Sequence, residues 1–106
     1  MNKINFDKKR NKLMEKMKSG DKFFIEFGKL DDKAFQDGII PKKYKELTMI
    51  SVSIAVKCEE CIEFHVQESK NAGATNEEII EAVKMGLMAS GSTGYPYARK
   101  VFEIIN

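Results

Sequence analysis

Three reactive side chains, Cys58, Cys61 and His65, lie within the stretch CEECIEFH. They are the only two cysteines and the only histidine of the chain. If the stretch is helical, the three share one face, because residues three and four apart lie on the same side of a helix. Such a cluster could bind a metal, form a disulfide or carry out thiol redox chemistry.

Each cysteine has neighbours that affect the stability of its thiolate. Cys58 lies where the helix is expected to start, and the helix dipole and the charge of Lys57 both lower a thiol pKa there. The two glutamates that follow Cys58 raise the thiol pKa, so the sequence leaves the direction of the net change in the Cys58 pKa open. His65 is one helical turn after Cys61, where its imidazole can take the Cys61 proton directly or through a water molecule.

Four kinds of site can be compared with this cluster. A structural zinc site could add Glu46 as a fourth ligand, but structural zinc usually takes ligand pairs from two separate segments. A c-type haem requires C-x-x-C-H, and Ile62 stands where that histidine would be. A purely structural disulfide between Cys58 and Cys61 is allowed, but it closes too short a loop to stabilise much. We favour a thiol–disulfide site, because it alone gives His65 a role, and we expect neither a metal nor a cofactor.

Composition and charge narrow the class of protein. With 106 residues and 42% hydrophobic content, we expect residues 1–106 to form a single domain, with part of its stabilisation coming from a partner subunit. Eighteen Lys and Arg against sixteen Asp and Glu, mixed along most of the chain, argue against a nucleic-acid partner. The chain has no apolar run long enough for a membrane helix and no signal-peptide core, so we expect a soluble, cytoplasmic protein with no membrane partner.

Apolar residues recur at spacings of three and four along nearly the whole chain, which predicts an all-α fold of about six helices. Gly20 is expected to end the first helix, and Asp21 to cap the second. The expected helices are residues 5–18, a second carrying the stripe Phe23, Phe27, Leu30 and Ala34, a third in KKYKELTMISVSIAV after Pro41, residues 59–72, a fifth from Asn76 to SGSTG, and a last one in YPYARKVFEII.

The third and fourth helices must position the reactive cluster. The third carries Leu47, Ile50 and Ile54 on one face and is expected to be central, and Glu46, near its start, is expected to be exposed. The fourth is expected to end at a left-handed Gly73. Further expectations concern the fifth helix: a capping box of Thr75 and Glu78, and close approach of a neighbouring helix at Gly86 and Ala89.

The stretch ELTMISVSIAVKCEECIEFHVQESKNAGATNEEIIEA resembles the alkylhydroperoxidase D and carboxymuconolactone decarboxylase superfamily. The redox branch of that superfamily has a Glu, eleven residues, and then C-x-x-C-x-x-x-H, and Glu46, Cys58, Cys61 and His65 stand at those positions. The later stretch AGATNEEIIEAV also resembles a helix junction of the family. The resemblance covers residues from about 40 to 90.

This resemblance implies an all-helical, alkylhydroperoxidase D-like domain that forms trimers or hexamers with sites at or near subunit interfaces. It implies a proton relay from Glu46 through His65 to Cys61, with Cys61 attacking a hydroperoxide and Cys58 resolving the product as a disulfide. An external dithiol, such as a lipoyl group, would reduce the disulfide, or the dithiol form would reduce a peroxiredoxin. Some members have a histidine directly before the second cysteine, whereas this chain has Glu60. The negative charge of Glu60 tends to raise the pKa of the Cys61 thiol.

The predicted function is therefore that of a thiol–disulfide oxidoreductase acting on peroxides or on a dithiol partner. One alternative is a cofactor-free decarboxylase or isomerase of a small lactone acid, with His65 as its acid or base. That chemistry needs no cysteines, and no convincing basic cluster stands beside the site, since Arg99 is the only arginine outside the N-terminal helix. A second alternative is a non-catalytic oligomeric scaffold or redox-sensing subunit, whose thiols would oxidise too slowly to turn over.

Overall fold

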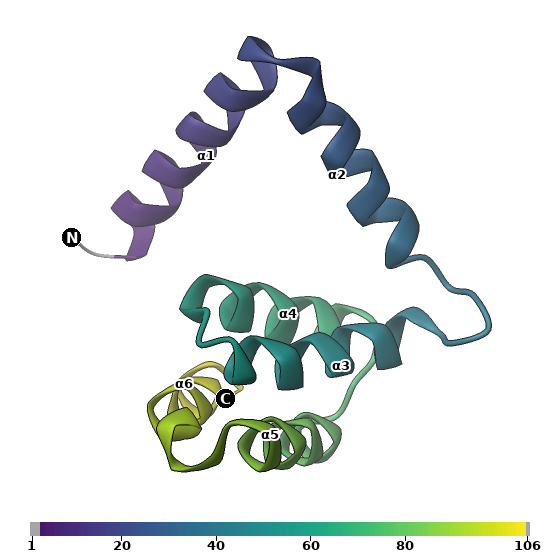
Figure 1. Cartoon of the computed structure of the whole chain (residues 1–106), viewed down its shortest axis with the longest axis vertical. Helices are drawn as coiled ribbons and strands as arrows, with labels where there is room; N and C mark the ends of the chain where they lie inside the picture. The colour runs from purple at the N-terminus through teal and green to yellow at the C-terminus, as the bar shows by residue number, and fades with distance from the viewer. Residues whose placement is uncertain (1–2, 106) are drawn as a thin grey trace. The chain divides into compact units, whose positions relative to one another are not determined.

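The computed structural model describes residues 3–105, with side chains from residue 5 onward. Every regular element in this range is helical (Figure 1), so the predicted all-α class is confirmed. None of these helices is long and apolar enough to cross a membrane. The elements are α1 (Lys3–Gly20), α2 (Lys22–Ala34), α3 (Lys42–Ala55), α4 (Glu59–Asn71), α5 (Asn76–Ser90), the short 3₁₀ helix η1 (Gly91–Gly94) and α6 (Tyr95–Ile104).

The chain divides into two compact units, one ending at Ala34 and the other beginning at Phe35. The first unit holds α1 and α2. The carboxylate of Asp21 accepts a hydrogen bond from the backbone N–H of Phe23 at 2.9 Å, which confirms Asp21 as a cap of α2. Gly20 is the last residue of α1, as predicted, but its φ is not positive, so the left-handed conformation typical of such a glycine is not found there. The expectation of one domain over the whole chain stays a prediction.

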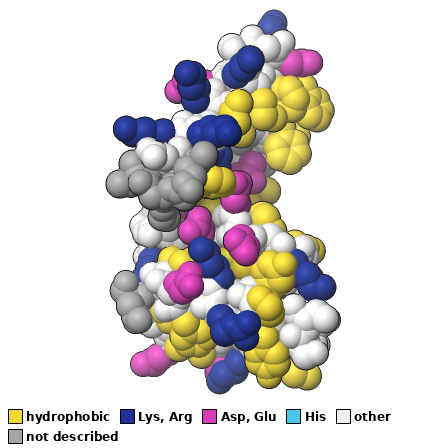
Figure 2. Space-filling model, turned by 90° about the vertical axis from the view of Figure 1, so that its left-hand side faces the viewer, with side chains coloured by type: hydrophobic (Ala, Val, Ile, Leu, Met, Phe, Trp, Pro, Cys, Tyr) yellow, Lys and Arg dark blue, Asp and Glu magenta, His cyan; other side chains and the backbone are white. Residues whose placement is uncertain are grey.

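The predicted stripe on α2 is exposed within the first unit. Phe23 is 60% exposed, Phe27 62% and Leu30 65%, and no residue of α2 is buried. Figure 2 shows hydrophobic side chains gathered on the surface of this part of the chain. The spacing of the stripe therefore predicted the helix correctly, but nothing within the described residues covers it.

The core of the second unit forms around α3, which lies against both α4 and α5 (Figure 1), as predicted for the central helix. α6 packs against α4 and α5 and closes this core. Apolar residues at helical spacing supply the buried side chains, because each helix turns one stripe inward. The buried apolar residues are Leu47, Ile50, Ile54, Ile62, Val66, Ile79, Ala82, Val83, Ala98, Val101 and Ile105.

The start of α5 has the predicted capping box. The Thr75 hydroxyl accepts the backbone N–H of Glu78 at 3.1 Å, and the Glu78 carboxylate accepts the backbone N–H of Thr75 at 2.9 Å. The hydrogen bond from the Thr75 backbone, together with the nearby Lys43 ammonium, lowers the pKa of Glu78 from its ordinary value. Local residue types therefore determine where α5 begins.

Gly86 is the point at which α5 approaches α3 closely. A Cβ atom there would lie 2.9 Å from Ile54 Cβ and 2.9 Å from the Ser51 carbonyl oxygen. The Ser51 hydroxyl also donates to the Ala82 carbonyl at 2.7 Å, which ties the two helices together at this level. The prediction for Gly86 is confirmed. Ala89, three residues later, is exposed, so no helix of the described residues approaches α5 closely there, contrary to the prediction.

We expect Gly86→Ala to lower the free energy of unfolding by about 1–3 kcal/mol, because the added methyl group overlaps packed atoms that cannot all move away. The matched control is Gly28→Ala in α2, where a Cβ would meet nothing within 4 Å. Alanine's better helix propensity should make that control neutral or stabilising. Denaturant unfolding of both variants measures the difference, and equal stability of the two would contradict the close approach.

Candidate active site

A tight connection between α3 and α4 places Cys58 at the start of α4. The Lys57 N–H bonds the Ile54 carbonyl at 3.2 Å, and the Cys58 N–H bonds the Ser53 carbonyl at 3.0 Å. These two bonds form a Schellman motif, which requires a left-handed residue directly after the helix. Lys57 occupies that position with φ of 61°. The chain thereby reverses sharply, and Cys58 becomes the N-terminal cap of α4.

The end of α4 has the same motif with a glycine. The Gly73 N–H bonds the Lys70 carbonyl at 2.9 Å, and the Ala74 N–H bonds the Ser69 carbonyl at 2.9 Å. Gly73 has φ of 94°, so the predicted left-handed glycine is confirmed. The chain therefore contains two matched helix ends, one with glycine and one with Lys57 in the left-handed position.

We expect Lys57→Gly to raise the free energy of unfolding by about 0.5–1 kcal/mol. A side chain in the left-handed region costs about 1–2 kcal/mol, and the greater entropy of glycine in the unfolded chain offsets part of the gain. Gly73→Ala should have the opposite sign, with a loss of about 1 kcal/mol. Denaturant unfolding of the oxidised protein checks both changes. A destabilised Lys57→Gly variant would show that the lysine side chain has a stabilising role that outweighs its backbone strain.

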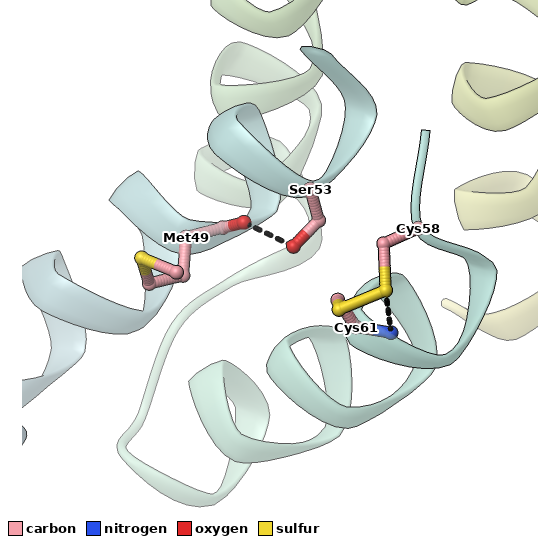
Figure 3. The surroundings of a disulfide bond; sticks show 4 residues. All are labelled: Met49, Ser53, Cys58 and Cys61. Carbon is pink, nitrogen blue, oxygen red and sulfur yellow. Dashed lines mark hydrogen bonds between the residues drawn. A yellow bond between two sulfur atoms is a disulfide. The ribbon is translucent and has the colours of Figure 1, made fainter. Parts of the chain in front are cut away.

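Cys58 and Cys61 are joined by a disulfide bond, with their Cα atoms 5.3 Å apart (Figure 3). Cys58 Sγ also accepts the backbone N–H of Cys61 at 3.2 Å, so a sulfur atom occupies the capping position of α4. Both residues are partly buried. The surroundings of the disulfide include Ser53 of α3, whose hydroxyl donates to the Met49 carbonyl at 2.5 Å. In the reduced protein the same helix N-terminus would stabilise a thiolate on Cys58.

Glu46 and His65 form a buried pair between α3 and α4. Glu46 Oε1 lies 2.6 Å from His65 Nδ1. Only 1% of Glu46 and 8% of His65 is exposed, which corrects the expectation of an exposed Glu46. The physical reason is that Glu46 shares one face of the central helix with Ile50 and Ile54, four and eight residues later, and both of these residues are fully buried.

Three residues beside this pair were not singled out from the sequence. Lys42 Nζ lies 2.7 Å from Glu46 Oε2. The Phe35 ring stacks on the His65 ring, with centroids 5.4 Å apart and an interplanar angle of 28°. The Phe64 ring covers His65 edge-on at 5.1 Å. The i, i+4 spacing of Lys42 and Glu46 was a usable signal, whereas Phe35 lies in an irregular segment without a periodic pattern.

The segment that carries Phe35 is fastened to the start of α3. The Asp37 carboxylate accepts the backbone N–H of Lys42 at 2.7 Å and so supplies the α3 cap that Pro41 lacks. The Lys45 ammonium donates to the Gln36 carbonyl at 2.7 Å. Pro41 itself is the N-cap residue and directly precedes the first helical residue, Lys42. These contacts explain how an irregular segment can hold an aromatic ring against the imidazole.

The four predicted site residues thus lie on facing parts of α3 and α4. Glu46 and His65 are in contact, Cys58 and Cys61 are bonded, and His65 follows Cys61 by one turn of α4. An ionised carboxylate only accepts hydrogen bonds, so with Glu46 ionised the proton of the neutral imidazole is on Nδ1 and Nε2 is left as the acceptor. The described residues include no group of three His, Cys, Asp or Glu side chains placed to hold a metal ion.

The model of the carboxymuconolactone decarboxylase family matches residues 21–103 of this helical chain. The protein belongs to this family. The match includes α2 and nearly all of the second unit, so it contains every residue of the candidate site. The superfamily predicted from the sequence is therefore confirmed.

A sequence relative and a solved structure agree with this assignment. A Paracoccus denitrificans protein named "Uncharacterized protein 4 in cox locus" is 30% identical over 103 residues, which cover 97% of this chain and 93% of the relative. A carboxymuconolactone decarboxylase family protein from Legionella pneumophila has a similar crystal structure, with a TM-score of 0.82, 29% identity, and coverage of 95% of this chain and 88% of that one.

A crystal structure of a family member from Thermotoga maritima is similar as well. Its TM-score is 0.85 and its identity 31%, and the match covers 95% of this chain and 86% of that chain. A role in an antioxidative response has been suggested for the Thermotoga protein. These likenesses confirm the predicted fold.

Proposed function

We propose that this carboxymuconolactone decarboxylase family protein is a thiol–disulfide oxidoreductase with alkylhydroperoxidase-type activity. The observation that carries the proposal is the buried pair of Glu46 and His65 one helical turn from a C-x-x-C pair that can close as a disulfide. A disulfide that only stabilised the fold would need no imidazole oriented by a carboxylate. The antioxidative role suggested for the Thermotoga relative supports the same chemistry.

The proposed reaction begins with the reduced protein. His65 Nε2 takes the proton of the Cys61 thiol, directly or through a water molecule, while Glu46 stabilises the imidazolium that forms. The thiolate attacks one peroxide oxygen, the O–O bond breaks, and the leaving alkoxide takes the proton from His65. Cys61 is oxidised to a sulfenic acid and the hydroperoxide is reduced to an alcohol.

The second half of the cycle forms and then reduces the disulfide. The Cys58 thiolate attacks the Cys61 sulfur, an S–S bond forms, and the sulfenic hydroxyl leaves as water after taking a proton. The disulfide seen between the two cysteines corresponds to the product of this step. An external dithiol, such as a lipoyl group, then donates two electrons and two protons and itself becomes a disulfide. In the alternative route, the reduced protein passes its electrons to the disulfide of a peroxiredoxin.

Assembly and location form part of the same proposal. The exposed apolar stripe of α2 supports burial against other copies of the chain, in a trimer or hexamer as the family resemblance implies. A reversible C-x-x-C pair without further cysteines fits a reducing compartment, so we place the protein in the cytoplasm. Glu60 is exposed beside Cys61, and its charge should make the thiolate harder to form than a histidine would.

The test is a count of free thiols over time after metal-free, reduced protein is mixed with about one equivalent of hydroperoxide. We expect rapid loss of both thiols, a mass decrease of about 2 Da for the disulfide, and recovery of the thiols with a dithiol. The control is protein with alkylated thiols, which should leave the hydroperoxide intact. Thiols that persist for hours would make the cysteine pair structural and would favour the decarboxylase or the scaffold alternative.

A further inference from the structure

The Glu46 carboxylate binds the ammonium group of Lys42 on the side opposite His65. Its Oε1 faces His65 Nδ1 at 2.6 Å, and its Oε2 faces Lys42 Nζ at 2.7 Å. The carboxylate is 1% exposed, whereas the Lys42 side chain is 37% exposed. A nearly buried carboxylate is therefore shared between a lysine at the edge of the site and a histidine inside it.

The charges of these three groups determine which of them carries a proton. A lysine beside a carboxylate keeps its proton at neutral pH, so Lys42 and Glu46 together carry no net charge. A second positive charge on His65 would then be unbalanced in a buried place, which disfavours the imidazolium. If Lys42 were neutral or absent, protonated His65 would balance the Glu46 charge instead.

The rings around the triad increase this effect. The Phe35 ring stacks on His65, and Lys42 Nζ lies 5.5 Å from the centroid of the Phe35 ring. Phe64 covers a second side of the imidazole. Apolar rings keep water away from the carboxylate and the imidazole, so the attraction and repulsion between the three charges are screened less than on an open surface.

Other charged groups on the elements around His65 pair with partners other than His65 and Glu46. On α6, Lys100 pairs with Glu63 at 3.5 Å, and Glu63 is two residues before His65 and therefore on another side of α4. On α5, Glu78 pairs with Lys43 at 3.0 Å. The irregular segment before α3 places Asp37 on the backbone N–H of Lys42.

On α4 itself, the cysteines that precede His65 are joined as a disulfide and do not titrate in the oxidised protein. The titration of His65 in that state is therefore free of any change in thiol charge. It reports directly on the charges that Glu46 and Lys42 place beside the ring.

We propose that Lys42 is a positioning residue, which keeps Glu46 ionised and thereby holds His65 neutral, with its proton on Nδ1 and Nε2 free to accept a proton. The relevance of this arrangement to peroxide reduction rests on the proposed function, but the arrangement itself does not. Lys42 acts through Glu46 and touches neither cysteine in the proposed reaction. It supplies the positive charge that keeps the base ready at neutral pH.

The test is NMR of the imidazole ring in the oxidised protein. The chain has a single histidine, so its ring signals need no assignment. In Lys42→Gln we expect the ring signals to show more of the protonated imidazole at a given pH, because a nearby positive charge is lost. Lys42→Arg keeps the charge and should restore the wild-type proportion.

The control is Lys43→Gln, which removes the same charge from the next residue of α3, where the lysine pairs with Glu78 rather than Glu46. It should leave the His65 titration unchanged. An equal shift in Lys43→Gln, or no shift in Lys42→Gln, would overturn the proposal. Ring ¹⁵N shifts of the wild-type protein test it without any variant, since a neutral ring protonated on Nε2 would also overturn it.

Activity supplies a second readout. The acid limb of the pH profile for thiol loss with hydroperoxide should move to higher pH in Lys42→Gln, with a lower rate on the acid side and recovery at higher pH. A change in stability alone would not move this limb. If the wild-type protein does not react with hydroperoxide, the proposed function fails while the NMR titration still tests Lys42.

Discussion

Cys61→Ser is expected to abolish the reaction of the reduced protein with hydroperoxide. A serine hydroxyl stays protonated at neutral pH and is a far weaker nucleophile than a thiolate, so the O–O bond is no longer attacked. The measurement is the consumption of hydroperoxide by the variant, together with the number of free thiols that remain. The variant should fold as the reduced wild type does, because the serine keeps the shape of the side chain and the α4 backbone does not depend on this sulfur.

Cys58→Ser is the matched control for that result, because it removes the other thiol of the same pair. It should consume about one hydroperoxide per chain and then stall, with Cys61 held as a sulfenic acid that mass spectrometry detects as a gain of about 16 Da. The opposite pattern, in which only Cys58→Ser is inert, would reverse the order of attack. The helix N-terminus at Cys58 would then be the reason, since it stabilises a thiolate there.

Glu46→Gln is expected to slow thiol oxidation by about 100-fold at neutral pH. The amide carries no charge, so it stabilises the imidazolium poorly, and its NH₂ group can face Nδ1 and place the ring proton on the wrong nitrogen. Lys42 also loses its anionic partner. Stopped-flow measurement of thiol loss under excess hydroperoxide, in parallel with the circular dichroism spectrum, separates a lost relay from a lost fold.

Glu81→Gln is the control for that variant. Glu81 makes the same kind of contact with a lysine, 2.7 Å from Lys84, but the pair is exposed on the surface of α5. An exposed ion pair contributes little, so the rate of thiol oxidation should stay at the wild-type level. If Glu46→Gln retained the wild-type rate as well, Glu46 would have no part in the relay.

The local elements of this fold follow from short-range rules. Thr75 and Glu78 start α5, Gly73 ends α4, and Asp21 caps α2, each through bonds that span only a few residues. Gly20 ends α1 as predicted but without a positive φ, because no bond after it requires a left-handed residue. Lys57 shows the converse, since a tight connection imposes the left-handed conformation on a residue that does not favour it.

The site depends more on long-range packing. Cys58, Cys61 and His65 share one helix, so their spacing alone indicated a reactive cluster. Glu46 is 19 residues from His65, and only the resemblance to the family predicted that the two act together. Its residue type had indicated an exposed Glu46, because a glutamate on an apolar face carries no sign of the buried partner that will satisfy it.

The sequence by itself determined the helical class, the family and the thiol pair, because periodicity, capping and the C-x-x-C spacing are local properties of the chain. Only the tertiary structure placed Glu46 beside His65, brought Phe35 onto the imidazole, and put Lys42 on the second carboxylate oxygen. Those contacts arise where α3, α4 and the irregular segment between α2 and α3 pack together. The charge of the imidazole depends on the sum of these contacts, and that sum exists only once the helices have packed.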